Sequence, residues 1–170
     1  DPRVTTDLPL PDTTCADIIV EAVVQNTSGT PRRGSVVGRI GDIRFSKKVE
    51  VAPWRTQNVT FTPAEFNALR ISDPRLWWPN CMGAQNIYDL HLAFEDEGGN
   101  VSDERDVTFG IREIDYAAGG PDKLALAVNG KRVYCKGGNW ALEEALKRID
   151  PKRLDAQVRM HRDANFNMIR

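Results

Sequence analysis

The sequence lacks any long apolar run and carries almost no net charge. No stretch of its 170 residues approaches the roughly 20 consecutive apolar residues that a membrane-spanning helix needs. The 23 Lys and Arg are balanced by 24 Asp and Glu, for a net charge of -1, so no long-range field attracts nucleic acid or an anionic membrane. We therefore expect neither nucleic acid nor a membrane as a partner.

Cysteine and histidine are also scarce. Cys15, Cys81 and Cys135 are widely spaced and odd in number, and the sequence has no Cys-x-x-Cys pair. This pattern argues against a disulfide framework and against a zinc site, so we interpret the three as buried thiols. The two histidines, His91 and His161, have no partner pattern and are expected to be surface or helix-packing residues. No metal site and no cofactor is predicted.

Apolar alternation characterises the first two thirds of the chain. Residues 17–25 alternate with a period of two, which predicts a strand with Ile18 and Val20 on one face. Further strands are predicted at residues 34–40, 43–51, 56–62, 87–95 and 107–111. About seven short strands ahead of residue 116 are typical of an immunoglobulin-like β-sandwich. The expected fold class is therefore mainly β.

Two smaller features lie in the same region. Residues 63–70 predict a single helical turn, because Pro63 suits its first position. The triplets that begin at Asn26, Asn58 and Asn100 match the glycosylation sequon. So short a pattern arises readily by chance, and we do not interpret these asparagines as glycosylated.

The composition changes after Tyr116. Ala117-Ala118-Gly119-Gly120-Pro121 is a run of small residues of the kind that connects domains. We therefore predict one domain at residues 1–116 and a second at residues 117–170.

The second region begins with a hairpin signal. Residues 124–128 and 132–136 flank Asn129-Gly130, the pair preferred in a two-residue type I′ turn. The stretch 132–136 also serves as the strand that leads into the following loop and helix.

A capped helix and a short apolar run complete the chain. Asp150 can cap a helix over residues 151–164, and Asn165 tolerates the left-handed conformation that ends one. Residues 166–170 then return to a strand-like pattern. The region therefore predicts strand, loop, helix and strand, a βαβ unit with nothing in the sequence to close it.

Several short patterns occur in order between residue 76 and residue 170. They are Leu76-Trp77-Trp78-Pro79, Tyr88-Asp89-Leu90, Phe109-Gly110-Ile111-Arg112, Val128-Asn129-Gly130-Lys131, Lys136-Gly137-Gly138-Asn139-Trp140 and Asn167-Met168-Ile169-Arg170. In this order they resemble glycoside hydrolase family 2, whose members join β-sandwich domains to a TIM-type barrel. Residues 1–75 match only in strand pattern. The resemblance implies an immunoglobulin-like β-sandwich followed by the first βαβ segment of a TIM (β/α)8 barrel.

The residue after Asn139 indicates a branch of this family. Galactosidase-like and glucuronidase-like members usually carry a histidine shortly after the matching asparagine, whereas Trp140 follows Asn139 directly here. The chain is more similar in this respect to the β-mannosidase, endo-β-mannosidase and exo-β-glucosaminidase branch.

The resemblance also implies a reaction. Retaining hydrolysis of a glycosidic bond uses two carboxyl groups about 5 to 5.5 Å apart, and in the resembled family both are glutamates on later barrel strands, beyond Arg170. The chain is therefore expected to be an inactive, structural piece of a larger β-glycosidase. Its expected partners are a carbohydrate substrate and the remaining domains of the same polypeptide. The alternative is a free-standing immunoglobulin-like carbohydrate-binding or adhesion module.

Three residues are candidates for the site of the larger enzyme. By the resemblance, Arg170 orients the nucleophile, and a guanidinium suits this role because its forked donors match a carboxylate. Asn139 offers an amide to sugar hydroxyls, and Trp140 offers a flat apolar face to a pyranose ring. The competing interpretations are strand capping or surface pairing for Arg170 and core packing for Trp140.

Other candidates are weaker. Trp77 and Trp78 suggest a sugar platform, but packing of an aromatic pair ahead of a strong strand is favoured. Glu143 and Glu144 are the paired carboxylates near the first barrel loop, yet adjacent side chains point in different directions, so solvated surface is favoured. Gly137-Gly138 is too short for a phosphate loop and lacks its lysine, which excludes a P-loop nucleotide site.

Overall fold

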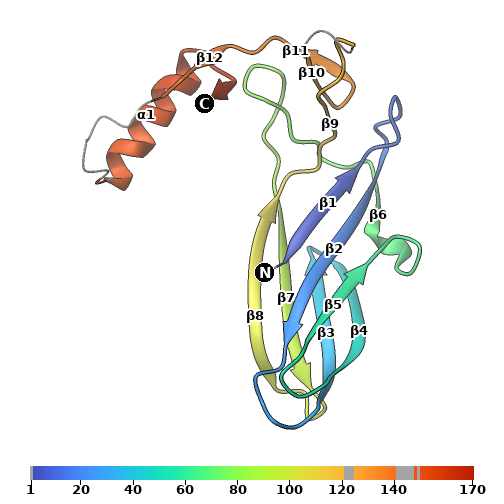
Figure 1. Cartoon of the computed structure of the whole chain (residues 1–170). Coiled ribbons are helices and arrows are strands. Elements are labelled where there is room, and N and C mark those ends of the chain that lie inside the picture. Colours follow the sequence, from blue (N-terminus) through green and yellow to red (C-terminus); the bar gives the residue numbers. More distant parts are fainter. Residues whose placement is uncertain (1, 121–124, 141–147, 149) are drawn as a thin grey trace. The chain divides into compact units, whose positions relative to one another are not determined.

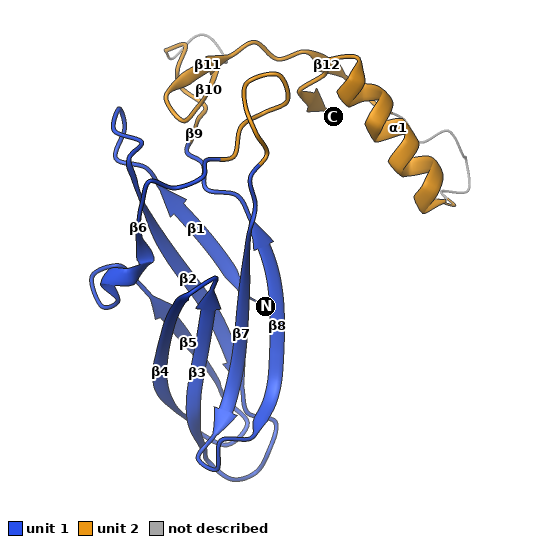
Figure 2. Ribbon diagram, turned by 180° about the vertical axis from the view of Figure 1, so that it is seen from behind, with its two compact units in different colours: residues 1–76, 86–113 blue, residues 77–85, 114–170 orange. Residues whose placement is uncertain are grey.

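The chain forms two compact units (Figure 2). The computed structural model describes residues 2–120, 125–140, 148 and 150–170. The first unit comprises Asp1–Leu76 and Asn86–Glu113, and the second comprises Trp77–Gln85 and Ile114–Arg170. The loop 77–85 thus belongs to the second unit although its sequence lies between strands of the first.

The first unit is a β-sandwich of two antiparallel sheets (Figure 1). One sheet contains β1 (Arg3–Asp7), β2 (Cys15–Gln25), β5 (Thr56–Phe61) and β6 (Arg70–Ser72), with β1, β5 and β6 all paired to β2. The other has the order β4 (Ile43–Val51), β3 (Arg32–Ile40), β7 (Tyr88–Asp96) and β8 (Val101–Phe109). The mainly β class expected from the sequence is confirmed.

The long strands of the sandwich match their sequence patterns. The predicted strand at 43–51 is found with those bounds, and β2, β3, β5 and β7 agree with their predicted bounds to within two residues at each end. The strand predicted at 107–111 is instead found at Val101–Phe109, so its predicted start was six residues too late. β1 and β6 were not predicted, because β1 is polar at four of its five positions and β6 has only three residues. The turn predicted at 63–70 is present as a shorter 3-10 helix, Asn67–Leu69.

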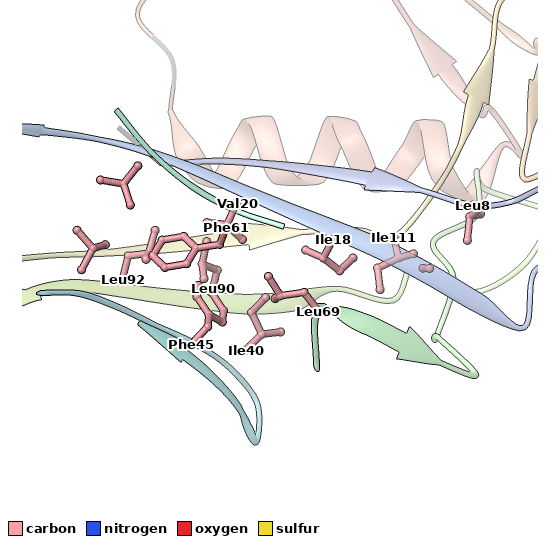
Figure 3. Close-up of a cluster of buried hydrophobic side chains, with 13 residues drawn as sticks. Leu8, Ile18, Val20, Ile40, Phe45, Phe61, Leu69, Leu90, Leu92 and Ile111 are labelled. Carbon is pink, nitrogen blue, oxygen red and sulfur yellow. The ribbon is translucent and has the colours of Figure 1, made fainter. Parts of the chain in front are cut away.

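The core lies between the two sheets. Ile18 and Val20 of β2 are fully buried, as their alternation predicted, and face Leu90 of β7 across the sandwich (Figure 3). Phe45 and Phe61 add aromatic contacts, with ring centroids 4.8 Å apart and planes tilted by 59°. Tilted aromatic pairs at this distance add to the free energy gained by burial alone.

One of the three sequon asparagines is a structural residue. Asn26 is only 5% exposed, and its amide donates to the carbonyls of Thr30, Val51 and Ala52 at 2.8 to 3.2 Å. A buried amide needs such partners, because leaving it unpaired would cost about 1 to 3 kcal/mol. The side chain therefore joins the end of β4 to the turn after β2.

The second unit begins with a three-stranded sheet. β9 (Ile114–Asp115), β10 (Leu126–Val128) and β11 (Lys131–Val133) pair antiparallel. Asn129 and Gly130 both have positive φ, 51° and 76°, which confirms the predicted two-residue turn. The predicted first residue of this hairpin, Leu124, lies outside the described residues.

A short βαβ unit follows. β12 (Gly137–Gly138) pairs in parallel with β13 (Met168–Ile169), and α1 (Pro151–Asp163) lies between them in sequence. Asp150 caps α1 by accepting from the amide of Lys152 at 3.0 Å, and Asn165 has a φ of 61° after its end. The predicted helix is thus confirmed to within one residue.

One strand prediction in this unit is wrong. Residues 132–136 were expected to lead the βαβ unit, but β11 ends at Val133 within the hairpin, and β12 provides the parallel partner instead. The reason is local geometry: a Cβ at Gly137 would collide with the carbonyl oxygen of Met168. Only glycine lets the two backbones approach so closely.

The cysteines are more exposed than predicted. All three are free thiols, with Cys15 half-buried in β2 and Cys81 and Cys135 exposed. The expectation of buried thiols is therefore wrong for the latter two, which lie in a loop and in a connecting segment rather than in a core strand. Among the described helices, none is long and apolar enough to cross a bilayer.

The approach of Gly38 to Phe45 generates a stability prediction. A Cβ at Gly38 would overlap the Phe45 ring, which is buried and has little room to move, so Gly38→Ala should destabilise the chain by about 1 to 3 kcal/mol. The exposed Gly29 has space for a Cβ, with its nearest neighbour 3.8 Å away, so Gly29→Ala is the matched control. Urea unfolding measures both, and equal effects would contradict the packing argument.

The ion pair between β2 and β6 generates a pH prediction. Arg70 donates Nε and Nη2 to the two carboxylate oxygens of Asp17, both at 2.7 Å, and these hydrogen bonds lower the pKa of Asp17. A lowered folded-state pKa stabilises the fold above the unfolded value of about 3.9, and this stabilisation is lost as the pH falls below it.

The stability difference between wild type and Asp17→Asn should therefore shrink as the pH falls from about 5 towards 2. Denaturant midpoints measured across this range test it. In an Arg70→Gln background the same substitution should lose its pH dependence, and an unchanged dependence there would contradict the assignment to Arg70.

Candidate functional site

The two parallel strands of the second unit bring their carboxyl ends together. Gly137 pairs with Met168 and Gly138 with Ile169. Beyond these pairs the backbones stay bonded: the amide of Arg170 donates to Gly138 O at 3.1 Å, and the amide of Trp140 donates to Arg170 O at 2.8 Å. The residues that follow β12 and β13 therefore lie side by side.

Asn139 and Arg170 meet at these strand ends. Nη1 of Arg170 donates to Oδ1 of Asn139 over 3.4 Å, and both residues are exposed. The contact is long for a hydrogen bond, so both side chains retain donors for other partners. An amide and a guanidinium in this arrangement can bind hydroxyl and carboxylate oxygens at the same time.

Trp140 packs against the helix. Its ring centroid lies 5.7 Å from that of His161, which in turn lies 5.5 Å from Phe166. His161 donates from Nδ1 to the carbonyl of Gln157 at 2.7 Å, and this fixes its ring. The expected helix-packing role of His161 is confirmed, and the half-buried Trp140 is positioned by this stack.

Asn167 supports the strand end, a role that was not predicted from the sequence although the residue begins the last of the ordered patterns. Its Oδ1 accepts from the amide of Lys136 at 2.8 Å, and its Nδ2 donates to the carbonyl of Tyr134 at 3.0 Å. The side chain thus holds β13 beside the segment that leads into β12. The available signal was a polar residue between the apolar Phe166 and Met168.

The two adjacent tryptophans belong to the second unit, and Trp78 packs within it. Trp78 is half-buried, its ring lies next to Gly83, and Nζ of Lys131 is 5.1 Å from its centroid. The carbonyl of Trp77 accepts from the amide of Asn129 at 3.0 Å. The contacts of the Trp78 ring agree with the packing interpretation rather than with an open sugar platform.

The remaining candidates add no ligand set. Glu143 and Glu144 lie outside the described residues. His91 is on the sandwich, 2.8 Å from a carboxylate oxygen of Asp106 on the neighbouring strand, as expected for a surface residue. In the part of the chain that the structure describes, no group of three or more His, Cys, Asp or Glu side chains is arranged to hold a metal.

The sandwich unit has a cleft of its own, separate in sequence from the candidate residues. It encloses about 950 Å³ between the end of β2 and the strands β7 and β8. Its lining is mostly small and charged, and Phe94 is the aromatic residue among the lining residues described. A cleft of this composition offers little flat surface for stacking on sugars.

Similar proteins act on carbohydrates. The chain is 35% identical, over all 170 of its residues, to an exo-β-D-glucosaminidase of Streptomyces avermitilis, of which it covers 19%. It is also 43% identical, over 101 residues, to a mannosylglycoprotein endo-β-mannosidase of Lilium longiflorum. This match covers 57% of this chain and 10% of that protein.

A solved structure shows the same fold. The Amycolatopsis orientalis exo-chitosanase CsxA, in complex with PNP-β-D-glucosamine, matches 99% of the chain with a TM-score of 0.87 at 26% identity, and the chain covers 19% of it. These similar proteins are glycoside hydrolases. The chain matches Glycosyl hydrolases family 2 over residues 1–112 and belongs to that family.

The parallel ladder generates a matched pair of predictions. Gly137→Ala places a Cβ against the Met168 carbonyl, whereas Gly138→Ala meets no atom within 4 Å. Because the ladder has few hydrogen bonds, each contributing about 1 kcal/mol, Gly137→Ala should speed amide exchange at Trp140 and Arg170 by about 10-fold or more, and Gly138→Ala should leave it unchanged. NMR-detected hydrogen exchange measures this, and equal behaviour of the two variants would contradict the register.

Proposed function

We propose that this chain forms the sandwich domain and barrel entry of a larger retaining β-glycosidase that acts on β-glucosaminides or β-mannosides. The observation that carries the proposal is the position of Asn139 and Arg170 at the carboxyl ends of two neighbouring parallel strands. In TIM barrels the active site occupies this end of the strands. The chain spans 19% of the length of the glucosaminidase relative, so the remaining catalytic groups would belong to other parts of the polypeptide.

The apolar surface of the second unit supports a barrel. Large apolar side chains on α1, β13 and the turn between them are exposed: Val158, Met160, Phe166, Met168 and Ile169. Two parallel strands and one helix cannot bury this surface themselves, and further βα units would cover it. We propose that the remaining domains of the same polypeptide are this partner, and that the first unit is the immunoglobulin-like domain preceding the barrel.

The residues at the strand ends would have different roles: binding the sugar and orienting the nucleophile. Retention needs two carboxyl groups about 5 to 5.5 Å apart, one acting as nucleophile and one as acid and base. Arg170 would hold the nucleophile ionised and oriented through its forked donors. Asn139 would bind a sugar hydroxyl, and the exposed part of Trp140 would contact the C–H face of the sugar.

The two substrate classes come from the similar proteins. An exo-β-D-glucosaminidase matches the whole chain, while the endo-β-mannosidase is more identical over a shorter segment. We propose the β-glucosaminide as the first class to test, because that likeness includes the strand ends at Asn139 and Arg170. The chain by itself, in this proposal, is structural and does not turn over substrate.

A free-standing carbohydrate-binding module is the weaker alternative. It would place sugar in the sandwich unit, where the cleft is lined mainly by small and charged side chains. It also leaves the exposed apolar side chains of α1 and β13 without a partner. Calorimetric titration of residues 1–116 with chitosan and mannan oligosaccharides distinguishes the two, since the glycosidase proposal predicts no measurable binding there.

The full-length protein provides the test of function. Arg170→Ala should lower kcat/KM by about 100-fold or more, the magnitude found when one preorganised donor is removed from a catalytic site. Arg159→Ala is the matched control, because Arg159 is exposed on α1 and pairs with Asp155 at 2.8 Å. Activity is measured against p-nitrophenyl β-glucosaminide and β-mannoside.

The outcomes separate the parts of the proposal. Cleavage of one substrate that falls in Arg170→Ala and persists in Arg159→Ala supports both the class and the role of Arg170. Undiminished activity of Arg170→Ala would contradict that role. No cleavage of either substrate would contradict the proposed substrate classes.

A further inference from the structure

The side-chain amide of Asn80, in the loop 77–85, reaches the end of α1. Nδ2 of Asn80 donates to the carbonyl of Arg162 at 2.9 Å and to the carbonyl of Phe166 at 3.0 Å. These partners are 82 and 86 residues away in sequence. The side chain therefore bridges the last turn of the helix and the segment that begins β13.

One of these carbonyls, that of Arg162, belongs to the last turn of α1, and the other, that of Phe166, lies just beyond it. The last four carbonyls of an α-helix lack partners within it, and here the amides of Ala164, Asn165 and Phe166 turn back to satisfy some of them. Asn80 completes the arrangement by binding Phe166 as well. Its two bonds thereby fix the direction in which the chain leaves the helix.

Cys81 makes a second contact at the same point. Its Sγ lies 3.1 Å from Oδ1 of Asn165, and both residues have positive φ, 68° and 61°. A cysteine in this conformation is strained relative to glycine. The strain is maintained by a closed turn, because the amide of Met82 donates to the carbonyl of Pro79 at 3.0 Å.

The loop that carries Asn80 is itself well supported. The amide of Trp78 donates to Ala84 O at 3.0 Å, and Nε2 of Gln85 donates to the carbonyls of Trp78 and Gly83 at 3.1 and 2.9 Å. At its start, the carbonyl of Trp77 is held by Asn129. Hydrogen bonds along the length of this loop therefore hold the backbone around Asn80 in place.

We propose that Asn80 is a positioning residue for Arg170, and this inference rests on the function proposed above. Phe166, which accepts from Asn80, lies two residues before β13, and Arg170 follows β13 directly. Only two residue pairs join β13 to β12. A shift of the α1–β13 turn would therefore move this short strand along β12. The loop thus sets the position of the guanidinium without touching substrate.

The side-chain chemistry of Asn80 gives a sharp test. Asn80→Ala removes both donated hydrogen bonds. Asn80→Asp keeps the shape, but its carboxylate only accepts at neutral pH and would face two carbonyl oxygens. If Asn80 acts as a donor, the two variants should be equally damaging, whereas a space-filling role would spare the aspartate.

Hydrogen exchange in the full-length protein is the readout independent of activity. Amides in segments 137–140 and 168–170 should exchange about 10-fold faster in both Asn80 variants, as expected for the loss of backbone hydrogen-bond partners. Asn100→Ala is the matched control, because Asn100 donates its amide to Asp96 within a hairpin of the sandwich. It should leave those segments unchanged.

Kinetics supply the second readout. With the better substrate, kcat should fall about 10-fold in both Asn80 variants while KM stays within about 2-fold, because misplacing a group that acts in the transition state spares ground-state binding. Unchanged exchange in both variants, or wild-type exchange in Asn80→Asp, would overturn the inference. If the Asn80 variants exchange faster but the protein cleaves neither substrate, the conclusion that Asn80 supports the strand would stand. Its role in positioning Arg170 for catalysis would then be overturned together with the proposed function.

Discussion

The parallel ladder between β12 and β13 is the constraint on which the candidate site depends. It comprises two residue pairs, so its own hydrogen bonds contribute only a few kcal/mol at about 1 kcal/mol each. Gly137 makes the ladder possible by admitting the opposite backbone. Asn167 and Asn80 reinforce it by bonding their amides to the backbone on either side. The proximity of Asn139 and Arg170 follows from this combination, and neither strand would hold its terminal residue in place alone.

Sequence reasoning succeeded where the signal was local. The alternation around Ile18, the turn at Asn129-Gly130 and the capping of α1 by Asp150 each depend on a few neighbouring residues, and all three are present in the structure. The pairing of β12 was missed because two glycines carry no periodicity. The bonds of Asn80 were missed because its partners are more than 80 residues distant, and nothing in the local sequence of an exposed loop indicates them.

The two units contribute differently to the proposed activity. The sandwich closes its own core with apolar side chains from both sheets. The second unit carries the polar strand ends and leaves large apolar side chains exposed. A sandwich fold does not specify a function by itself. The proposed chemistry therefore depends on a small set of side chains, and we propose that their geometry depends on the loop 77–85, which is inserted between two strands of the sandwich.

The central claim is that the carboxyl ends of β12 and β13 form part of a sugar-binding site. The most direct measurement is a crystal structure of the full-length protein with a glucosamine-configured inhibitor bound. The account predicts the amide of Asn139 within hydrogen-bond distance of a sugar hydroxyl and the guanidinium of Arg170 paired with a carboxylate beside the sugar. An inhibitor bound elsewhere, with Asn139 and Arg170 contacting neither sugar nor carboxylate, would contradict it.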